Sequence, residues 1–129
     1  HLKEGTDVSI FATGHTVWEA LEASKQLQEN GINCEIINIT TIKPLDQEAV
    51  LNSIQKTKCA VTCEEHQVLG GLGGSIAQLS AQKMPIPLEF VGVDDKFGES
   101  GKPMDLMKKY QIDKEAIFNA AMKVVKKKI

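Results

Sequence analysis

The chain has 129 residues, 42% of them hydrophobic and 25% charged, which predicts a single soluble domain over residues 1–129. Its net charge of -2 and sequence pI of about 5.9 give no strong field of one sign, so we expect no nucleic-acid and no membrane partner. No apolar run approaches the roughly 20 residues that span a bilayer, and no signal-peptide pattern opens the chain.

Short apolar runs alternate with helical patterns along the whole chain. Near-continuous apolar strands joined by helices predict an α/β fold whose mostly parallel sheet is covered on both faces. We expect strands at 8–12, 34–39, 59–63 and 88–93. The helices expected between them run from Thr16 to the closing Asn30-Gly31, from just after Asp46, and over 75–83. After the last strand we expect a short helix at 104–109 and a last helix at 114–128 capped by Asp113.

Several helix ends have recognisable signals. Thr16 and Glu19 fit a capping box, and Asp46 is placed to cap the helix that follows it. Gly31 suits the left-handed residue that ends a helix. The segment 84–87 (MPIP) ends the helix before it, because proline cannot continue a helix.

The stretch EEHQVLGGLGGSIAQ, residues 64–78, has the position of a phosphate-binding loop between a strand and a helix. Its sequence matches neither known phosphate-binding motif. A Walker A loop ends in Gly-Lys-Ser or Gly-Lys-Thr, whereas this loop ends in Gly74-Ser75 without the lysine. A dinucleotide fingerprint needs a third glycine where this chain has Ile76. Asp94 follows the next strand, as a ribose-binding acid would. Two interpretations stay open, close backbone packing at the glycines and binding of an anion.

Side chains capable of acid–base or metal chemistry lie near this loop. Glu64 and Glu65 are adjacent at a strand end and point to opposite faces, so they do not form one carboxylate pair. His66 suits a general base or, more commonly in a turn, a hydrogen-bonding or interface residue. Cys59 and Cys63 precede it in a C-x3-C-x2-H pattern that lacks a fourth zinc ligand, and an odd count of three cysteines in apolar surroundings predicts reduced, buried thiols in a cytoplasmic protein.

A second distinctive loop covers residues 94–107 (DDKFGESGKPMDLM). Phe97 and Met104 are apolar residues in polar company there, which suits either a partner surface or packing back onto the core. At the strand ends, His15 joins Gly14 at the edge where parallel sheets place their ligands.

Three stretches in order, 4–14 (EGTDVSIFATG), 64–77 (EEHQVLGGLGGSIA) and 91–113 (VGVDDKFGESGKPMDLMKKYQID), resemble the C-terminal domain of transketolase, most closely that of the split form made as two polypeptides. The resemblance covers nearly the whole chain. It implies a three-layer α/β/α domain with a mixed sheet of about five strands, one edge strand being antiparallel. The related 2-oxoacid dehydrogenase β subunits and deoxyxylulose-phosphate synthases have a similar Glu-Glu and Gly-Gly loop, and they remain alternatives.

The resemblance also implies a complete enzyme of the pentose phosphate pathway that transfers a two-carbon ketol unit between sugar phosphates. That enzyme uses thiamine diphosphate and a divalent metal (Mg²⁺), bound by domains whose motifs are absent here. We therefore expect no catalytic, cofactor or metal residue in this chain, and a homo-oligomeric, cytoplasmic enzyme in which the thiamine-binding domains or subunit are its partners.

Domain packing, dimer assembly or regulation is then the expected role, and a small-anion-binding regulatory module is the alternative. The residues predicted to form an interface or an anion-binding loop are Glu64, Glu65, His66, Gly70, Gly71, Gly73, Gly74, Ser75, Phe97, Gly98, Glu99 and Ser100.

Overall fold

A computed structural model describes residues 2–14, 16–66, 69–93 and 103–128, with side chains in the last range from Asp113 onward. Its elements are β1 (Val8–Ala12), α1 (Thr16–Glu29), β2 (Cys34–Asn38), α2 (Gln47–Thr57), β3 (Ala60–Glu65), α3 (Gly71–Lys83), β4 (Leu88–Val93) and α4 (Pro103–Lys126). The predicted alternation of strands and helices is confirmed.

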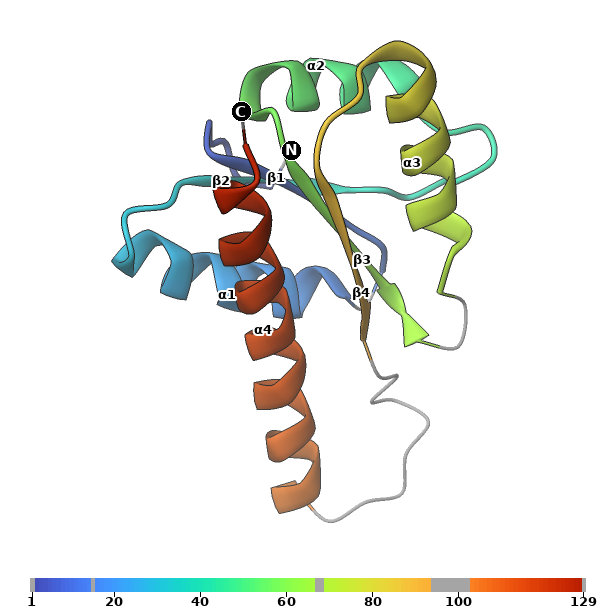
Figure 1. The fold of residues 1–129 in the computed structure, drawn as a ribbon. Helices are drawn as coiled ribbons and strands as arrows, with labels where there is room; N and C mark the ends of the chain where they lie inside the picture. The colour runs from blue at the N-terminus through green and yellow to red at the C-terminus, as the bar shows by residue number, and fades with distance from the viewer. Residues whose placement is uncertain (1, 15, 67–68, 94–102, 129) are drawn as a thin grey trace.

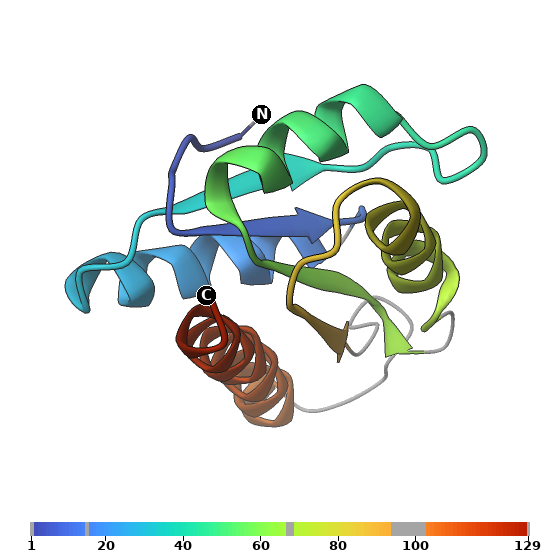
Figure 2. The same ribbon diagram turned by 45° about the horizontal axis from the view of Figure 1, so that its top comes forward.

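The strands form one parallel sheet in the order β2-β1-β3-β4. Helices α1 and α4 cover one face and α2 and α3 cover the other, as Figures 1 and 2 show from two directions. The three-layer α/β/α architecture is therefore confirmed. Because all four strands are parallel, the loops that follow them meet at one edge of the sheet.

The sheet has four described strands, where the family resemblance implied about five. Antiparallel pairing among the described residues is limited to an isolated bridge between Lys3 and Ile36, on the outer side of β2. There the amide of Ile36 donates to the Lys3 carbonyl at 2.9 Å, and the amide of Leu2 donates to the Ile36 carbonyl at 2.9 Å. This short pairing lies at a sheet edge, as the implied antiparallel strand would.

Alternating side chains of the strands supply a core on each face of the sheet. Ile10 on β1 packs with the α1 and α4 side chains, whereas its neighbour Phe11 packs with those of α2 and α3. This two-residue alternation is the normal geometry of a strand, and burial on both faces explains why the strand sequences are almost continuously apolar. The three cysteines are free and buried, as predicted.

The predicted break between the last two helices is wrong. The expected short helix at 104–109 and the last helix at 114–128 are one continuous helix, α4, and Asp113 lies inside it, 4% exposed, where a cap had been predicted. No glycine or proline separates the two segments, so the backbone continues, and Ile117, Ala121 and Val124 carry its packing onto the sheet. Helix α1 begins at Thr16, as predicted, but the Thr16 hydroxyl lies 2.8 Å from the Thr13 carbonyl and 3.0 Å from the Cys63 carbonyl, either of which can accept its proton, an arrangement different from the predicted capping box.

Other predicted ends are confirmed. The Asp46 side chain accepts from the Ala49 amide at 3.1 Å and caps α2. Gly31 has φ +77°, the left-handed conformation expected after α1. Helix α3 ends at Lys83, immediately before the segment with two prolines.

A buried hydroxyl cluster joins β1 to α2. Ser9 Oγ lies 2.5 Å from Ser53 Oγ and 2.6 Å from Thr57 Oγ1, and Thr57 Oγ1 is within 3.1 Å of the Cys59 carbonyl. By contrast, the buried hydroxyl of Thr62 on β3 has no hydrogen-bond partner among the described residues. Buried polar groups are normally paired. The paired cluster at Ser9 should therefore stabilise the fold, whereas the unpaired hydroxyl of Thr62 should destabilise it.

Candidate functional site

The turn between β3 and α3 is built around the carboxylate of Glu64. This side chain is 1% exposed, and its Oε1 accepts from the Leu72 amide at 3.0 Å while its Oε2 accepts from the Gly73 amide at 2.8 Å. These amides belong to the first turn of α3, where backbone N–H groups have no partner within the helix. Glu64 therefore caps α3, which begins at Gly71, four residues before the predicted start at Ser75.

The capping carboxylate occupies the position that a bound phosphate would take in a phosphate-binding loop. An external anion at these amides would meet the buried charge of Glu64 and compete with two charge-assisted hydrogen bonds. The donor set of this turn thus does not fit a diphosphate group. In the described part of the chain, no group of three or more His, Cys, Asp or Glu side chains is arranged to hold a metal ion.

The surrounding structure places different demands on each glycine of the loop. Gly70 precedes α3 with φ +111°, a conformation that favours glycine. At Gly73 an added Cβ would lie 2.7 Å from Cδ1 of Phe90 and 3.2 Å from the Thr62 hydroxyl, so α3 approaches β3 and β4 more closely than a side chain permits. At Gly74 an added Cβ would meet nothing within 4 Å, and at Gly71 it would make ordinary contacts. Close packing within the domain therefore explains Gly73 but not Gly74.

The other predicted acid–base residues are not assembled into one site. Glu64 points into α3, Glu65 is half-buried at the end of β3, and His66 is exposed. His66 Nδ1 would lie 2.9 Å from a Cβ added to Gly92, so the imidazole lies against the β4 backbone. His15, Asp94 and the predicted residues Phe97, Gly98, Glu99 and Ser100 lie outside the described residues.

Cys63 lies beside this acidic turn, one residue before Glu64. Burial raises the pKa of its thiol far above the ordinary value, and the negative charges of Glu19 and Glu64 raise it further. A thiol in such surroundings stays protonated and is a poor nucleophile and metal ligand. The C-x3-C-x2-H pattern is accordingly explained by core cysteines, the alternative favoured by the sequence.

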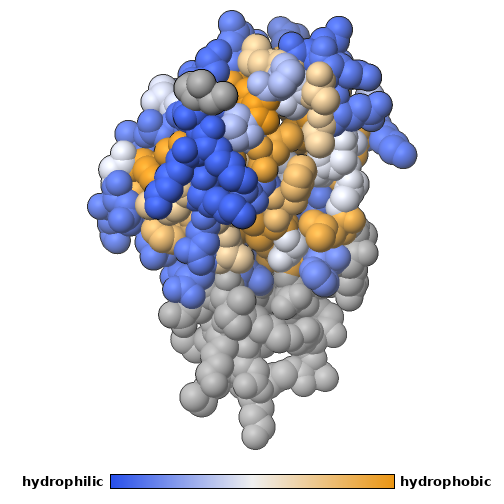
Figure 3. Space-filling model, viewed as in Figure 1, coloured by the Kyte–Doolittle hydropathy of each residue, from blue (hydrophilic) through white to orange (hydrophobic). Residues whose placement is uncertain are grey.

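Exposed apolar side chains are a feature that the sequence motifs do not indicate. Leu69 in the loop is 48% exposed, Phe90 on β4 is 50% exposed, and Trp18 on α1 is 61% exposed. Figure 3 shows a band of hydrophobic surface over β4, between α4 and α3. The apolar sequence of β4 suggested a strand covered on both faces. In the sheet, however, β4 is an edge strand. The sequence pattern alone could not reveal this exposure.

Comparison with known proteins gives this arrangement a family. The family model described as "Transketolase, C-terminal domain" matches residues 1–117. The chain belongs to the transketolase C-terminal domain family. A solved structure of a split gene transketolase, in an inactive beta4 tetramer, has a TM-score of 0.84 and 41% identity; the match covers 99% of this chain and 42% of that chain.

Relatives in sequence are longer than this transketolase C-terminal domain. A 6-deoxy-6-sulfo-D-fructose transketolase subunit from Clostridium sp. (strain MSTE9) is 45% identical over 127 residues, which are 98% of this chain and 39% of the relative. A 1-deoxy-D-xylulose-5-phosphate synthase from Halothermothrix orenii is 37% identical over an alignment of 130 positions that covers 99% of this chain and 20% of the relative. Within the part of the chain that the structure describes, none of the helices could span a lipid bilayer.

Proposed function

We propose that this domain is part of a thiamine-diphosphate-dependent transketolase, in which it packs onto the thiamine-binding domains or subunit and stabilises a homo-oligomer in the cytoplasm. The match to the transketolase C-terminal domain over residues 1–117 carries the proposal. The complete enzyme would transfer a two-carbon ketol unit between sugar phosphates. Thiamine diphosphate and Mg²⁺, held by the other domains, would supply the carbanion chemistry of that transfer.

The capped turn supports a packing role for this chain. The nearly completely buried carboxylate of Glu64 accepts hydrogen bonds from the α3 amides that would otherwise attract a phosphate group. Catalysis needs groups that reach substrate, and the carboxylate of Glu64 is committed to α3. We therefore propose that the chain has no catalytic centre, and that its loops act as contact surfaces.

The outward side of the β3–α3 loop is the contact surface that the geometry favours. Leu69 is a half-exposed leucine, and Gly74 leaves open space where any other residue would place a side chain. Apolar side chains next to uncovered backbone allow a partner to approach closely. The two glycines therefore have different proposed roles: Gly73 allows close packing of α3 on the sheet, whereas Gly74 allows close approach of a partner.

The test mixes this chain with the thiamine-binding polypeptide of the same enzyme and measures complex mass by light scattering, together with ketol transfer. We expect a complex that is active while this chain alone is inactive. Gly74→Arg should weaken association about tenfold or more, since interface-centre residues are worth upwards of about 1.4 kcal/mol. Gln55→Arg, at an exposed position of α2, is the matched control and should associate normally.

Association of a folded Gly74→Arg variant at the control's affinity would exclude the loop as a contact surface. Ketol transfer by this chain alone would refute the packing role. The deoxyxylulose-phosphate synthase alternative is favoured by the 37% identical relative. It predicts that the reconstituted complex forms 1-deoxyxylulose 5-phosphate and does not exchange ketol units between sugar phosphates.

A further inference from the structure

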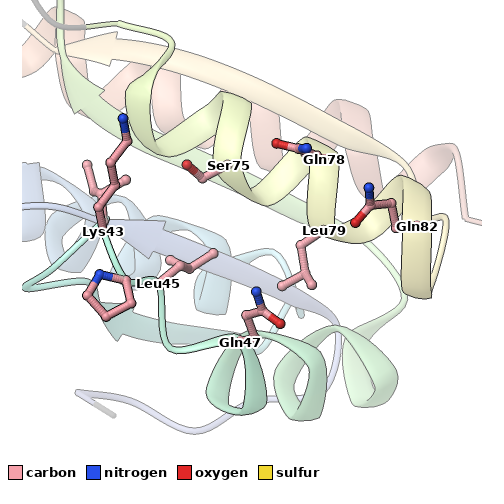
Figure 4. A pocket seen from close by; sticks show the side chains of 9 residues that line it. Lys43, Leu45, Gln47, Ser75, Gln78, Leu79 and Gln82 are labelled. Carbon is pink, nitrogen blue, oxygen red and sulfur yellow. The ribbon is translucent and has the colours of Figure 1, made fainter.

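A second feature lies on the same side of the sheet, next to the capped turn. The loop before α2 and the outer side of α3 enclose an open cleft of about 320 Å³. Figure 4 shows Ser75, Gln78 and Gln82 along α3 on one side of the cleft, and Lys43 on the loop and Gln47 at the start of α2 on the other. Leu45 and Leu79 lie between these polar groups. A concave surface with a few converging polar groups over an apolar floor is the usual form of a small-molecule site.

The walls of this cleft are fixed by the fold. Leu79 belongs to the core cluster on the α2 and α3 side, and Ile42 and Leu45 pack against that cluster. The cap formed by Asp46 on the Ala49 amide fixes the first turn of α2. The floor is therefore rigid, whereas the polar side chains above it reach into solvent.

The chemistry of the lining selects the kind of ligand. Of the nine residues that line the cleft, one is a cation, Lys43, and none is acidic. The carboxylate of the adjacent Asp46 is held by its own helix at 3.1 Å. A lysine ammonium is a mobile point charge that suits a phosphate group. Three glutamine amides and the Ser75 hydroxyl both donate and accept hydrogen bonds, as a ligand with several hydroxyl groups requires.

The same lining argues against a macromolecular partner. None of the nine residues is aromatic, and the large exposed apolar side chains Trp18, Leu69 and Phe90 lie outside the cleft. Protein interfaces are enriched in aromatic anchors at their centres. The volume lies near the lower end, about 300 Å³, of small-molecule sites, which suits a compact ligand.

We propose that the cleft between the 42–47 loop and α3 binds a small phosphorylated polyol, with the phosphate at Lys43 and the hydroxyl groups at Gln47, Gln78 and Gln82. This site differs from the amides at the start of α3, which Glu64 fills. All nine lining residues belong to this chain, and Gln78 lies one helical turn after Gly74, so the cleft adjoins the proposed contact surface.

The experiment titrates the ¹⁵N-labelled chain with ribose 5-phosphate, ribose and inorganic phosphate and follows backbone and glutamine side-chain amides by NMR. Ribose 5-phosphate should bind more tightly than either fragment and shift the amides of the three glutamines. Lys43→Met should weaken ribose 5-phosphate about tenfold, the loss of one charge-assisted contact, and leave ribose unaffected. Gln78→Leu should weaken both sugars.

Two matched controls lie on the same helices outside the cleft. Lys83→Met and Gln55→Leu alter exposed residues of α3 and α2, and both should bind as the wild type does. The proposal is overturned by any of three results: no binding at millimolar ligand, equal weakening by Lys83→Met and Lys43→Met, or shifts centred on the Leu72 and Gly73 amides. The last result would assign the anion to the start of α3. None of these results bears on association with the thiamine-binding polypeptide.

Discussion

Replacing Gly73 or its neighbour Gly74 by alanine tests the close approach of α3 to the sheet. Both residues lie in the first turn of α3, so alanine should bring a similar gain in helix propensity, up to about 1 kcal/mol. At Gly74 the new methyl group meets nothing within 4 Å, and the gain should be realised. At Gly73 it would lie 2.7 Å from Phe90 Cδ1. Overpacking of this kind costs about 1–3 kcal/mol, which exceeds the gain.

Urea denaturation should therefore show Gly74→Ala as neutral or stabilised and Gly73→Ala as destabilised, with a difference of about 1–3 kcal/mol between them. A double-mutant cycle identifies the cause. In a Phe90→Ala background the ring is absent, and Gly73→Ala should lose most of its cost. The reasoning is refuted if the two alanine variants have equal stability, or if the cost at Gly73 persists without the ring.

Three further outcomes follow from buried polar groups and thiols. Glu64→Gln removes the capping charge and one amide hydrogen bond, so it should lower the free energy of unfolding, measured in urea, by about 1.5–3 kcal/mol. It should also speed hydrogen exchange of the amides at the start of α3, and unchanged exchange there would contradict the cap. Thr62→Val should be neutral or stabilising, since it removes an unpaired buried hydroxyl, whereas Ser9→Ala should cost about 1–3 kcal/mol because the buried Ser53 hydroxyl loses its partner; the reverse order would be inconsistent with the network. Burial raises the pKa of Cys59 from 9.0 to about 11, so the unfolded thiol ionises first and stability should fall by about 1 kcal/mol per pH unit as pH rises through that window; a Cys59→Ala variant should lose that part of the slope.

The fold was predictable because its signals are local and repeated. Apolar runs such as VSIFA and CAVTC can be buried on both faces only in a covered parallel sheet, and Asp46 and Gly31 mark helix ends by their own conformational preferences. The break at Asp113 was predicted wrongly because a capping residue within a helix has no strong local effect. There, neither glycine nor proline interrupts residues 104–128, and the helix continues through Asp113.

The site was less predictable because its contacts join distant residues. The glycine loop was recognised, but the partner of its α3 amides is Glu64, eight and nine residues earlier in the sequence. A glutamate at a strand end before a glycine-rich turn is a weak signal, and it becomes informative only when the sheet holds the strand beside the helix. The cleft at Lys43 and Gln78 has no motif, since its two walls meet only in the folded chain.

The carboxylate of Glu64 also determines how the turn responds to its surroundings. In a phosphate-binding loop the order of the turn depends on ligand concentration, since binding stabilises the folded form by mass action. Here the anion is covalently attached to the adjacent strand and is always present at the same local concentration. The start of α3 consequently keeps one conformation whatever the metabolite level. The turn should therefore respond little to the concentration of phosphate-bearing metabolites.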